Sequence, residues 1–131
     1  MAVVGVGIDV VDVARMREAL AGPRGNRLRQ RVFTAVERAD CERQPALSAA
    51  RYASRFAAKE AVLKSLGRQA RLGFAWPDVE IARNAAGAPE VRLHGRAAER
   101  ARGLGARRVL VSLAHEASVA VAQAIAESTA E

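Results

Sequence analysis

The chain has 131 residues, half of them hydrophobic, which fits one domain over residues 1–131 with a core of its own. The single cysteine, Cys41, excludes an intramolecular disulfide and favours an incidental thiol in a reducing compartment. No apolar run is long enough to cross a membrane, no basic leader opens the chain, and the net charge of +7 indicates an acidic partner. We expect a cytoplasmic protein that meets a nucleic acid, an anionic membrane surface or an acidic protein.

The N-terminal segment predicts a strand followed by a helix. Residues 3–9 form a β-branched run with glycines, and we expect this strand to end at Asp9. Residues 12–21 have helical composition, and a loop over residues 22–26 with at most a short helical turn should follow. Asp9 is therefore placed at a strand end.

Capping signals predict the next two helices. Thr34 and Glu37 match a capping box, so a helix of about ten residues should start there and end before the next proline. Ser48 is a second plausible N-cap, followed by a long helix over residues 49–66 that Gly67 ends in a left-handed conformation.

The second half of the chain predicts a hairpin, a helix and two strands. Residues 78–83 and 90–94 alternate polar and apolar side chains on either side of a turn. A helix over residues 95–104 and strands over 109–114 and 118–125 should follow. The predicted fold class is α+β, a mostly antiparallel sheet packed on one long helix.

The long helix carries the only two lysines of the chain, Lys59 and Lys64, whereas every other basic residue is an arginine. A lysine is a compact charge that suits phosphate, which indicates an active-site helix. Glu60 and Lys64 are four residues apart and share a face, while Lys59 lies on a neighbouring line.

Four residues are candidates for chemistry: Asp9, Glu60, Lys64 and His115. Two carboxylates without a cysteine or histidine pair suggest a hard metal such as magnesium, completed by water and substrate phosphate. Each residue also has a plainer explanation, since Glu60 and Lys64 form an ordinary helix pair worth about 0.2–0.5 kcal/mol, Asp9 is a possible cap and His115 a turn residue. From the residues alone, the functional and the structural interpretation have about even support.

Arginines crowd residues 15–31, with Glu18 as the only acidic residue among them. No aromatic side chain is interleaved with them, which disfavours a single-strand nucleic-acid binder. A basic nucleic-acid-binding module without catalysis is the alternative function, and a solvated face that binds nothing is the plainest interpretation.

Three segments in order carry a resemblance: GIDVV at residues 7–11, RFAAKEAVLKSLG at 55–67 and VSLAHE at 111–116. Together they resemble the holo-acyl-carrier-protein synthase family of small phosphopantetheinyl transferases. The resemblance implies transfer of 4'-phosphopantetheine from coenzyme A to a serine of an apo acyl carrier protein, which releases adenosine 3',5'-bisphosphate. The carrier class stays open between fatty-acid, polyketide and multidomain synthases, and Met1 favours a free-standing protein.

The same resemblance implies roles for single residues. Asp9 and Glu60 match the family's magnesium ligands, Lys64 matches the lysine at the pyrophosphate, and either Glu60 or a metal-bound water is the base. The implied coenzyme A contacts are Arg55, Lys59, Lys64, Gly87, Pro89, Ser112 and His115. Leu110 and Ala114 depart from the family pattern beside His115.

The resemblance also implies the partners. Arg15 matches a first-helix arginine that meets the acidic carrier protein, and Arg24 and Arg27 extend that surface. This accounts for the basic cluster without nucleic acid or membrane. Small members of the family are homotrimers with active sites at subunit interfaces, so we expect the same here.

Overall fold

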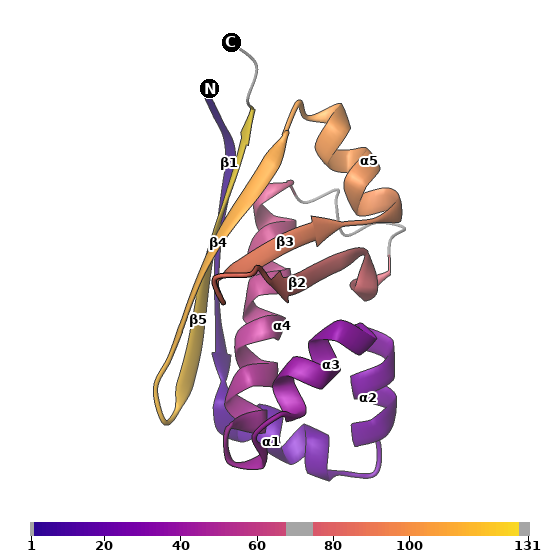
Figure 1. Ribbon diagram of the computed structural model, residues 1–131, viewed down its shortest axis with the longest axis vertical. Coiled ribbons are helices and arrows are strands. Elements are labelled where there is room, and N and C mark those ends of the chain that lie inside the picture. The colour runs from indigo at the N-terminus through magenta and orange to yellow at the C-terminus, as the bar shows by residue number, and fades with distance from the viewer. Residues whose placement is uncertain (1, 68–74, 129–131) are drawn as a thin grey trace.

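The structure is a computed structural model that describes residues 2–67 and 75–128 (Figure 1). In chain order the elements are β1 (Ala2–Asp12), α1 (Val13–Ala21), α2 (Gly25–Val32), α3 (Ala35–Glu42), α4 (Ser48–Ser65), β2 (Val79–Arg83), β3 (Pro89–Leu93), α5 (Gly95–Gly103), β4 (Arg108–His115) and β5 (Val119–Ser128). Short 3-10 turns precede α4 and β2, at Pro45–Leu47 and Trp76–Asp78. Within the described ranges, no helix is long and apolar enough to span a bilayer.

The strands form two antiparallel sheets, one of three strands in the order β1-β5-β4 and one hairpin of β2 and β3. Helix α4 runs along one face of the larger sheet, with α1, α2 and α3 gathered at one end of it and the hairpin and α5 towards the other (Figure 1). The predicted α+β class is confirmed. The predicted single sheet is divided into two, because the hairpin strands pair with each other and lie across α4.

Small residues allow α4 to lie directly on β1. A side chain at Gly5 would clash with the carbonyl oxygen of Ser65, and one at Gly7 with that of Ala61. Ala57 and other alanines of α4 are fully buried in the same core. The backbones of strand and helix therefore approach closely, and the two glycine contacts show that β1 runs antiparallel to α4.

The opposite face of the larger sheet is apolar and exposed in the single chain. Its large side chains on β1 and β4 are between 46 and 62% exposed: Val6, Ile8, Val10 and Leu110. Strand alternation explains the pattern, since every second residue points away from α4. This outer sheet face is available for a partner.

The prediction that Asp9 ends the first strand is wrong. The pairing with β5 continues past Asp9, which lies opposite Ala122, as far as Asp12 opposite Val119. Asp12 caps α1 instead, because its side chain accepts a hydrogen bond of 2.9 Å from the backbone N–H of Ala14. β-branched Val10 and Val11 extend the strand and leave Asp9 inside it.

The predicted capping box is confirmed, since Thr34 Oγ1 accepts from the Glu37 N–H at 3.2 Å and Glu37 Oε1 accepts from the Thr34 N–H at 2.8 Å. Ser48 is not a cap, because the 3-10 turn before it leads straight into α4 and Leu47 takes the N-cap position. Gly67 has the predicted left-handed conformation, with φ of +91°.

The loop predicted over residues 22–26 is shorter than expected, because α2 begins at Gly25. A side chain at Gly25 would clash with the Leu20 carbonyl, so glycine here serves close packing of α2 on the end of α1. The hairpin, α5 and the last two strands lie close to their predicted ranges.

Candidate active site

Asp9 and Lys64, which are far apart in the sequence, are in contact where β1 crosses α4. Lys64 Nζ lies 3.0 Å from Asp9 Oδ1 and donates a second hydrogen bond of 2.9 Å to the backbone carbonyl of Ile8. The Lys64 side chain is 45% exposed and that of Asp9 19%. The structure thus places a carboxylate and an ammonium together in a position that a solvent-borne ligand can reach.

Glu60 lies beside the Asp9 and Lys64 pair. It lies one turn before Lys64 on the same face of α4 and is partly exposed. Asp9 follows Gly7 by two residues on the face of β1 that meets α4, a step of roughly 6.6 Å or about one helical turn. Because β1 runs antiparallel to α4, Asp9 lies alongside the turn before Ala61, which is the turn that carries Glu60.

The donor set of this cluster fits magnesium. Asp9 and Glu60 offer carboxylate oxygens, and Mg²⁺ is usually held by one or two carboxylates together with water and substrate phosphate. Among the described residues, no group of three or more His, Cys, Asp and Glu side chains could hold a metal ion. A metal here would therefore depend on oxygens from water and substrate.

Lys59 does not join this cluster, although it precedes Glu60. Its side chain and that of Glu37 are both 0% exposed, and Lys59 Nζ lies 2.9 Å from Glu37 Oε1. The ammonium also donates to the carbonyl oxygens of Trp76, at 3.2 Å, and Val79. Burial lowers the pKa of Lys59 and the Glu37 carboxylate opposes that shift. Lys59 is enclosed by protein in the single chain, so the geometry gives no support to the implied coenzyme A contact.

Arg55, one turn before Lys59, also faces inward. Its side chain is 7% exposed and pairs with the carboxylate of Asp40. Within the described part of the chain, its Nε is a buried polar atom without a hydrogen-bond partner. The implied coenzyme A contact of Arg55 has little accessible surface to support it in a single chain.

Ser112 and His115 lie on β4, apart from the Asp9 and Lys64 pair. Strand β5 separates β4 from β1, so the distance across the sheet is about 9.6 Å, two strand spacings. Both residues are exposed, and Ser112 lies on the outer sheet face beside Leu110. A single chain does not bring them to the carboxylates.

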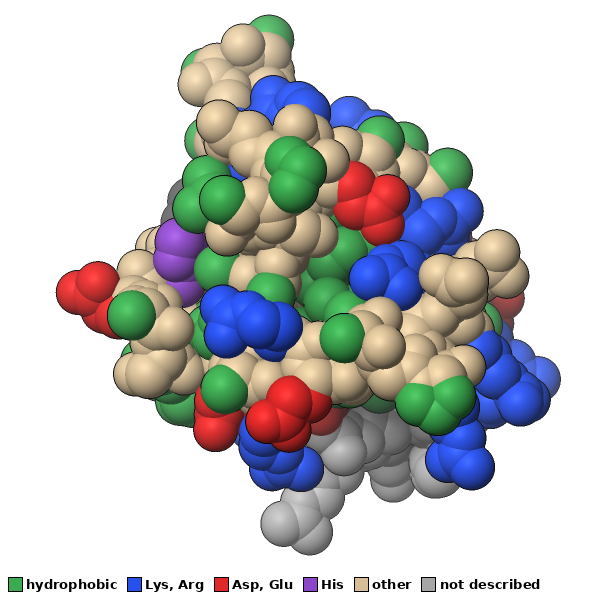
Figure 2. All heavy atoms as spheres, turned by 90° about the horizontal axis from the view of Figure 1, so that it is seen from below, with side chains coloured by type: hydrophobic (Ala, Val, Ile, Leu, Met, Phe, Trp, Pro, Cys, Tyr) green, Lys and Arg blue, Asp and Glu red, His purple; other side chains and the backbone are tan. Residues whose placement is uncertain are grey.

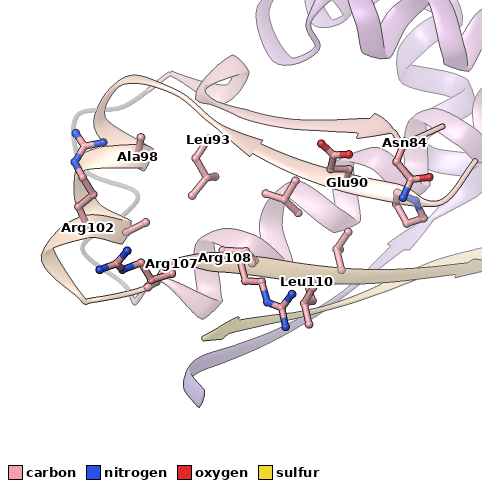
Figure 3. A pocket seen from close by; sticks show the side chains of 14 residues that line it. Asn84, Glu90, Leu93, Ala98, Arg102, Arg107, Arg108 and Leu110 are labelled. Atoms are coloured by element: carbon pink, nitrogen blue, oxygen red, sulfur yellow. The ribbon is translucent and has the colours of Figure 1, made fainter. Parts of the chain in front are cut away.

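Pro89 lines a cavity of about 500 Å³ between β3, α5 and β4, which we call the hairpin cavity (Figure 3). Leu93 and Val109 contribute apolar walls, and Arg102 and Arg107 lie at the α5 end. Gly87 sits in the adjoining turn with φ of +85°. The sequence analysis missed this cavity, since its walls meet only through packing of the hairpin; the arginines around the end of α5 were the one available signal.

The predicted carrier-binding arginines line two hollows at the helical end of the molecule. Arg24 and Arg27 border a groove of about 830 Å³ with Leu28 as part of its apolar wall. Arg15 and Leu28 line a second hollow of about 360 Å³ that includes Asp9. Basic side chains stand around apolar ones on this end of the molecule (Figure 2). Leu28 belongs to both hollows, so the basic groove adjoins the candidate active site.

Cys41 has no part in this site. It is fully buried, and burial raises the pKa of its thiol to about 12. A thiol with so high a pKa is not ionised near neutral pH and is a poor nucleophile. This agrees with the interpretation of an incidental thiol.

The chain is similar to known proteins in both sequence and structure. The family model described as "4'-phosphopantetheinyl transferase superfamily" matches residues 5–122. A holo-[acyl-carrier-protein] synthase of Anaeromyxobacter sp. (strain K) is 48% identical over 129 residues, which cover 97% of this chain and 98% of the relative. A Plasmodium yoelii acyl carrier protein synthase with ADP bound superposes with a TM-score of 0.83 at 31% identity, covering 98% of both chains. A Bacillus anthracis holo-(acyl-carrier-protein) synthase in complex with CoA (3',5'-ADP) superposes at 0.77 with 26% identity, covering 97% of this chain and 98% of that one.

Proposed function

The chain belongs to the 4'-phosphopantetheinyl transferase superfamily, and we propose that it acts as a holo-acyl-carrier-protein synthase. It transfers 4'-phosphopantetheine from coenzyme A to a serine hydroxyl of an apo acyl carrier protein. The observation that carries the assignment is the contact of Lys64 with Asp9, which joins two of the three family-like segments at one accessible place. Family membership favours this function over the alternative of a nucleic-acid-binding module.

The chemistry is a phosphoryl transfer. The serine oxygen attacks the phosphorus next to the pantetheine arm, the bond from that phosphorus to the bridging oxygen of the pyrophosphate breaks, and adenosine 3',5'-bisphosphate leaves. Lys64 Nζ, held by Asp9 and the Ile8 carbonyl, offsets negative charge on the departing oxygen. Glu60 lies one turn before Lys64 and is proposed to take the serine proton.

Magnesium is part of the proposal. Asp9 and Glu60 would hold the ion through carboxylate oxygens, as the donor set of the cluster allows. The ion would supply positive charge against the pyrophosphate when bound. Lys64 remains the protein's own cation at the same phosphates.

The coenzyme contacts are proposed around the hairpin cavity. Pro89 lines it, and the guanidinium groups of Arg102 and Arg107 suit phosphate oxygens through paired hydrogen bonds. Gly87 adjoins it, while Ser112 and His115 on β4 are proposed to meet coenzyme A across a subunit boundary. Arg55 and Lys59 are left out because they are buried.

The carrier protein is proposed to dock on the basic groove and on Arg15. Its acidic surface would match Arg24 and Arg27, and the adjoining hollow leads to Asp9, where the serine must arrive. Surface charges attract such a partner over about one Debye length, roughly 8 Å at physiological salt, so its affinity should fall as salt rises.

A homotrimer with active sites at subunit interfaces is the proposed assembly. The outer sheet face supports it, because Val6, Ile8, Val10 and Leu110 would otherwise leave a contiguous apolar surface in water. Ser112 on that face would then lie close to a neighbouring chain. Sedimentation velocity of the wild-type protein should give one species of three chains, and a monomer at micromolar concentration would refute the assembly. A cytoplasmic location stays a prediction.

The function is tested by incubating the protein with coenzyme A, Mg²⁺ and a panel of apo carrier proteins and weighing each carrier by mass spectrometry. At least one carrier should gain the mass of a phosphopantetheine group. Glu99→Gln, which alters an exposed carboxylate of α5, is the matched control for carboxylate variants of the site. Failure of every carrier, with a folded protein and Mg²⁺ present, would reject the proposal.

A further inference from the structure

Helix α3 presents two carboxylates, Glu37 and Asp40, which are three residues apart and share one face of the helix. Each of them reaches both α4 and β2. They line neither the hollow that includes Asp9, nor the hairpin cavity, nor the basic groove. We call the contacts of Glu37 the inner bridge and those of Asp40 the outer bridge.

The inner bridge is fully enclosed. Glu37 Oε1 lies 2.9 Å from Lys59 Nζ on α4, and Glu37 Oε2 accepts a hydrogen bond of 2.7 Å from the backbone N–H of Ile81 on β2. Thr34, at the start of α3, adds a bond of 2.7 Å from its hydroxyl to Glu80 Oε2 on the same strand. Glu37 thus pairs with a buried ammonium and also accepts from a buried backbone N–H of β2. Opening the bridge would leave these groups without partners, at a high cost in free energy.

The outer bridge reaches the surface. Asp40 Oδ2 pairs with Arg55 on α4, while Asp40 Oδ1 lies 3.0 Å from Arg83 Nε on β2 and 3.3 Å from Arg43 Nη2. Arg83 is the last residue of β2 and stands directly before the turn that leads to Pro89. Asp40 therefore holds the strand end from which the proposed coenzyme-binding turn extends.

The contact points of the two bridges are similarly spaced on α4 and on β2. Arg55 and Lys59 are one turn apart on α4, and Ile81 and Arg83 are two residues apart on one side of β2. In the described part of the chain, β2 pairs with β3 and neither joins the larger sheet. The hairpin is thus placed against α4 by core packing and by these side-chain bridges, without a shared backbone ladder.

We propose that Glu37 and Asp40 are positioning residues that set the hairpin against α4, and that Asp40, through Arg83, tunes the binding of coenzyme A without taking part in the transfer. This inference rests on the proposed function. The groups that do the chemistry have their own support, since Lys64 is held by Asp9 and the Ile8 carbonyl. Loosening the hairpin should therefore weaken coenzyme binding and leave the catalytic cluster in place.

The test is Asp40→Asn, which keeps the shape of the side chain and removes its charge. The KM for coenzyme A should rise about fivefold, with kcat and the KM for the carrier changed by less than about twofold. Calorimetric titration with coenzyme A alone should show the same rise in Kd. Glu99→Gln, the same chemical change on exposed α5, should alter none of these values.

Arg83→Met provides the second variant. It is partly exposed, so its loss leaves the buried core untouched, and it should raise the KM for coenzyme A by the same factor as Asp40→Asn. Since the proposed effect on coenzyme binding passes through the one contact between Asp40 and Arg83, the KM for coenzyme A in the double variant should be no higher than in either single variant.

Two results would overturn the inference: an unchanged coenzyme A KM in both variants with a lower active fraction, as a merely structural role predicts, or single effects that multiply in the double variant. Failure of the proposed function is a different result. In that case the wild-type protein itself would transfer nothing to any carrier.

Discussion

Lys59 and Lys64 stand on one helix, and each faces a carboxylate at nearly the same distance, 2.9 Å to Glu37 and 3.0 Å to Asp9. Their surroundings differ completely. The Lys59 pair is 0% exposed and completed by backbone carbonyls, whereas the Lys64 pair opens to solvent beside Glu60. A buried pair serves packing because nothing can reach it, and an accessible pair can exchange its partner for a ligand. The same pairing of residue types therefore has two uses in this molecule.

The accessible pair of Asp9 and Lys64, together with Glu60 beside it, should show the largest effect. That effect should fall on activity and not on stability. Glu60→Gln and Asp9→Asn should each lower kcat/KM by about a thousandfold, because each removes a carboxylate proposed to hold the magnesium ion, and Glu60→Gln also removes the proposed base. Their midpoint of urea unfolding should stay close to that of the wild type, since surface charges contribute about 0–1 kcal/mol. Initial rates of transfer, followed by the mass gained by the apo carrier, measure the loss, and Glu99→Gln is the control. A variant that keeps wild-type rates would remove its residue from the site.

The buried pair should show the opposite behaviour. Lys59→Met leaves the Glu37 carboxylate buried without its cation, so the free energy of unfolding should fall by about 3–5 kcal/mol. Glu37→Gln in the same chain removes the stranded charge and should recover part of the loss. Urea titration of both variants checks this. A loss below about 1 kcal/mol in Lys59→Met would mean that the pair opens to water.

The difference between the two lysines was outside the reach of the sequence. Helical spacing correctly separated their lines on α4, and the Lys64 line was rightly joined to Asp9. Which line is buried depends on α3, because Glu37 covers Lys59, and its capping-box role gave no sign of a partner on another helix.

Local signals predicted most of the elements, and tertiary pairing decided the rest. The capping box of Thr34 and the left-handed Gly67 depend on neighbouring residues and were found. The end of β1 was misplaced at Asp9 because the strand continues only through its pairing with β5. The hairpin cavity escaped notice for the same reason.

The basic groove gives a smaller and separate effect on the accessible side. Replacing Arg24 and Arg27 by serine should raise the KM for the carrier protein about tenfold at low salt and leave kcat and the coenzyme A KM unchanged. The difference in carrier KM between this variant and the wild type should become smaller as salt is added. Steady-state rates at several salt concentrations measure this, and a salt-independent gap would point to packing as the cause.

The smallest predicted effect is a change in stability at low pH. It comes from Glu80, which accepts a hydrogen bond from Thr34 beside the inner bridge. Burial raises the pKa of Glu80, but hydrogen bonds from Thr34 and His94 outweigh it and leave that pKa below its ordinary value of 4.5. The folded protein then binds this proton less readily than the unfolded chain, so the contribution is present above about pH 4.5 and lost as the pH falls further.

Glu80→Gln should accordingly lower the free energy of unfolding by about 1 kcal/mol at pH 7, with the difference from the wild type vanishing in acid. Urea titrations at a series of pH values check this, with the exposed Glu90→Gln as control. A difference that stays constant with pH would assign the loss to shape alone.

The comparison of the two lysines is tested most directly by measuring transfer to an apo carrier per folded molecule, at saturating coenzyme A, for Lys64→Met and for the double variant Glu37→Gln, Lys59→Met. We expect Lys64→Met to be stable and to lose about a hundredfold or more in rate. The double variant should be less stable and keep its kcat within about threefold. An active Lys64→Met, or a folded double variant that transfers nothing, would contradict the division between an accessible catalytic pair and a buried structural one.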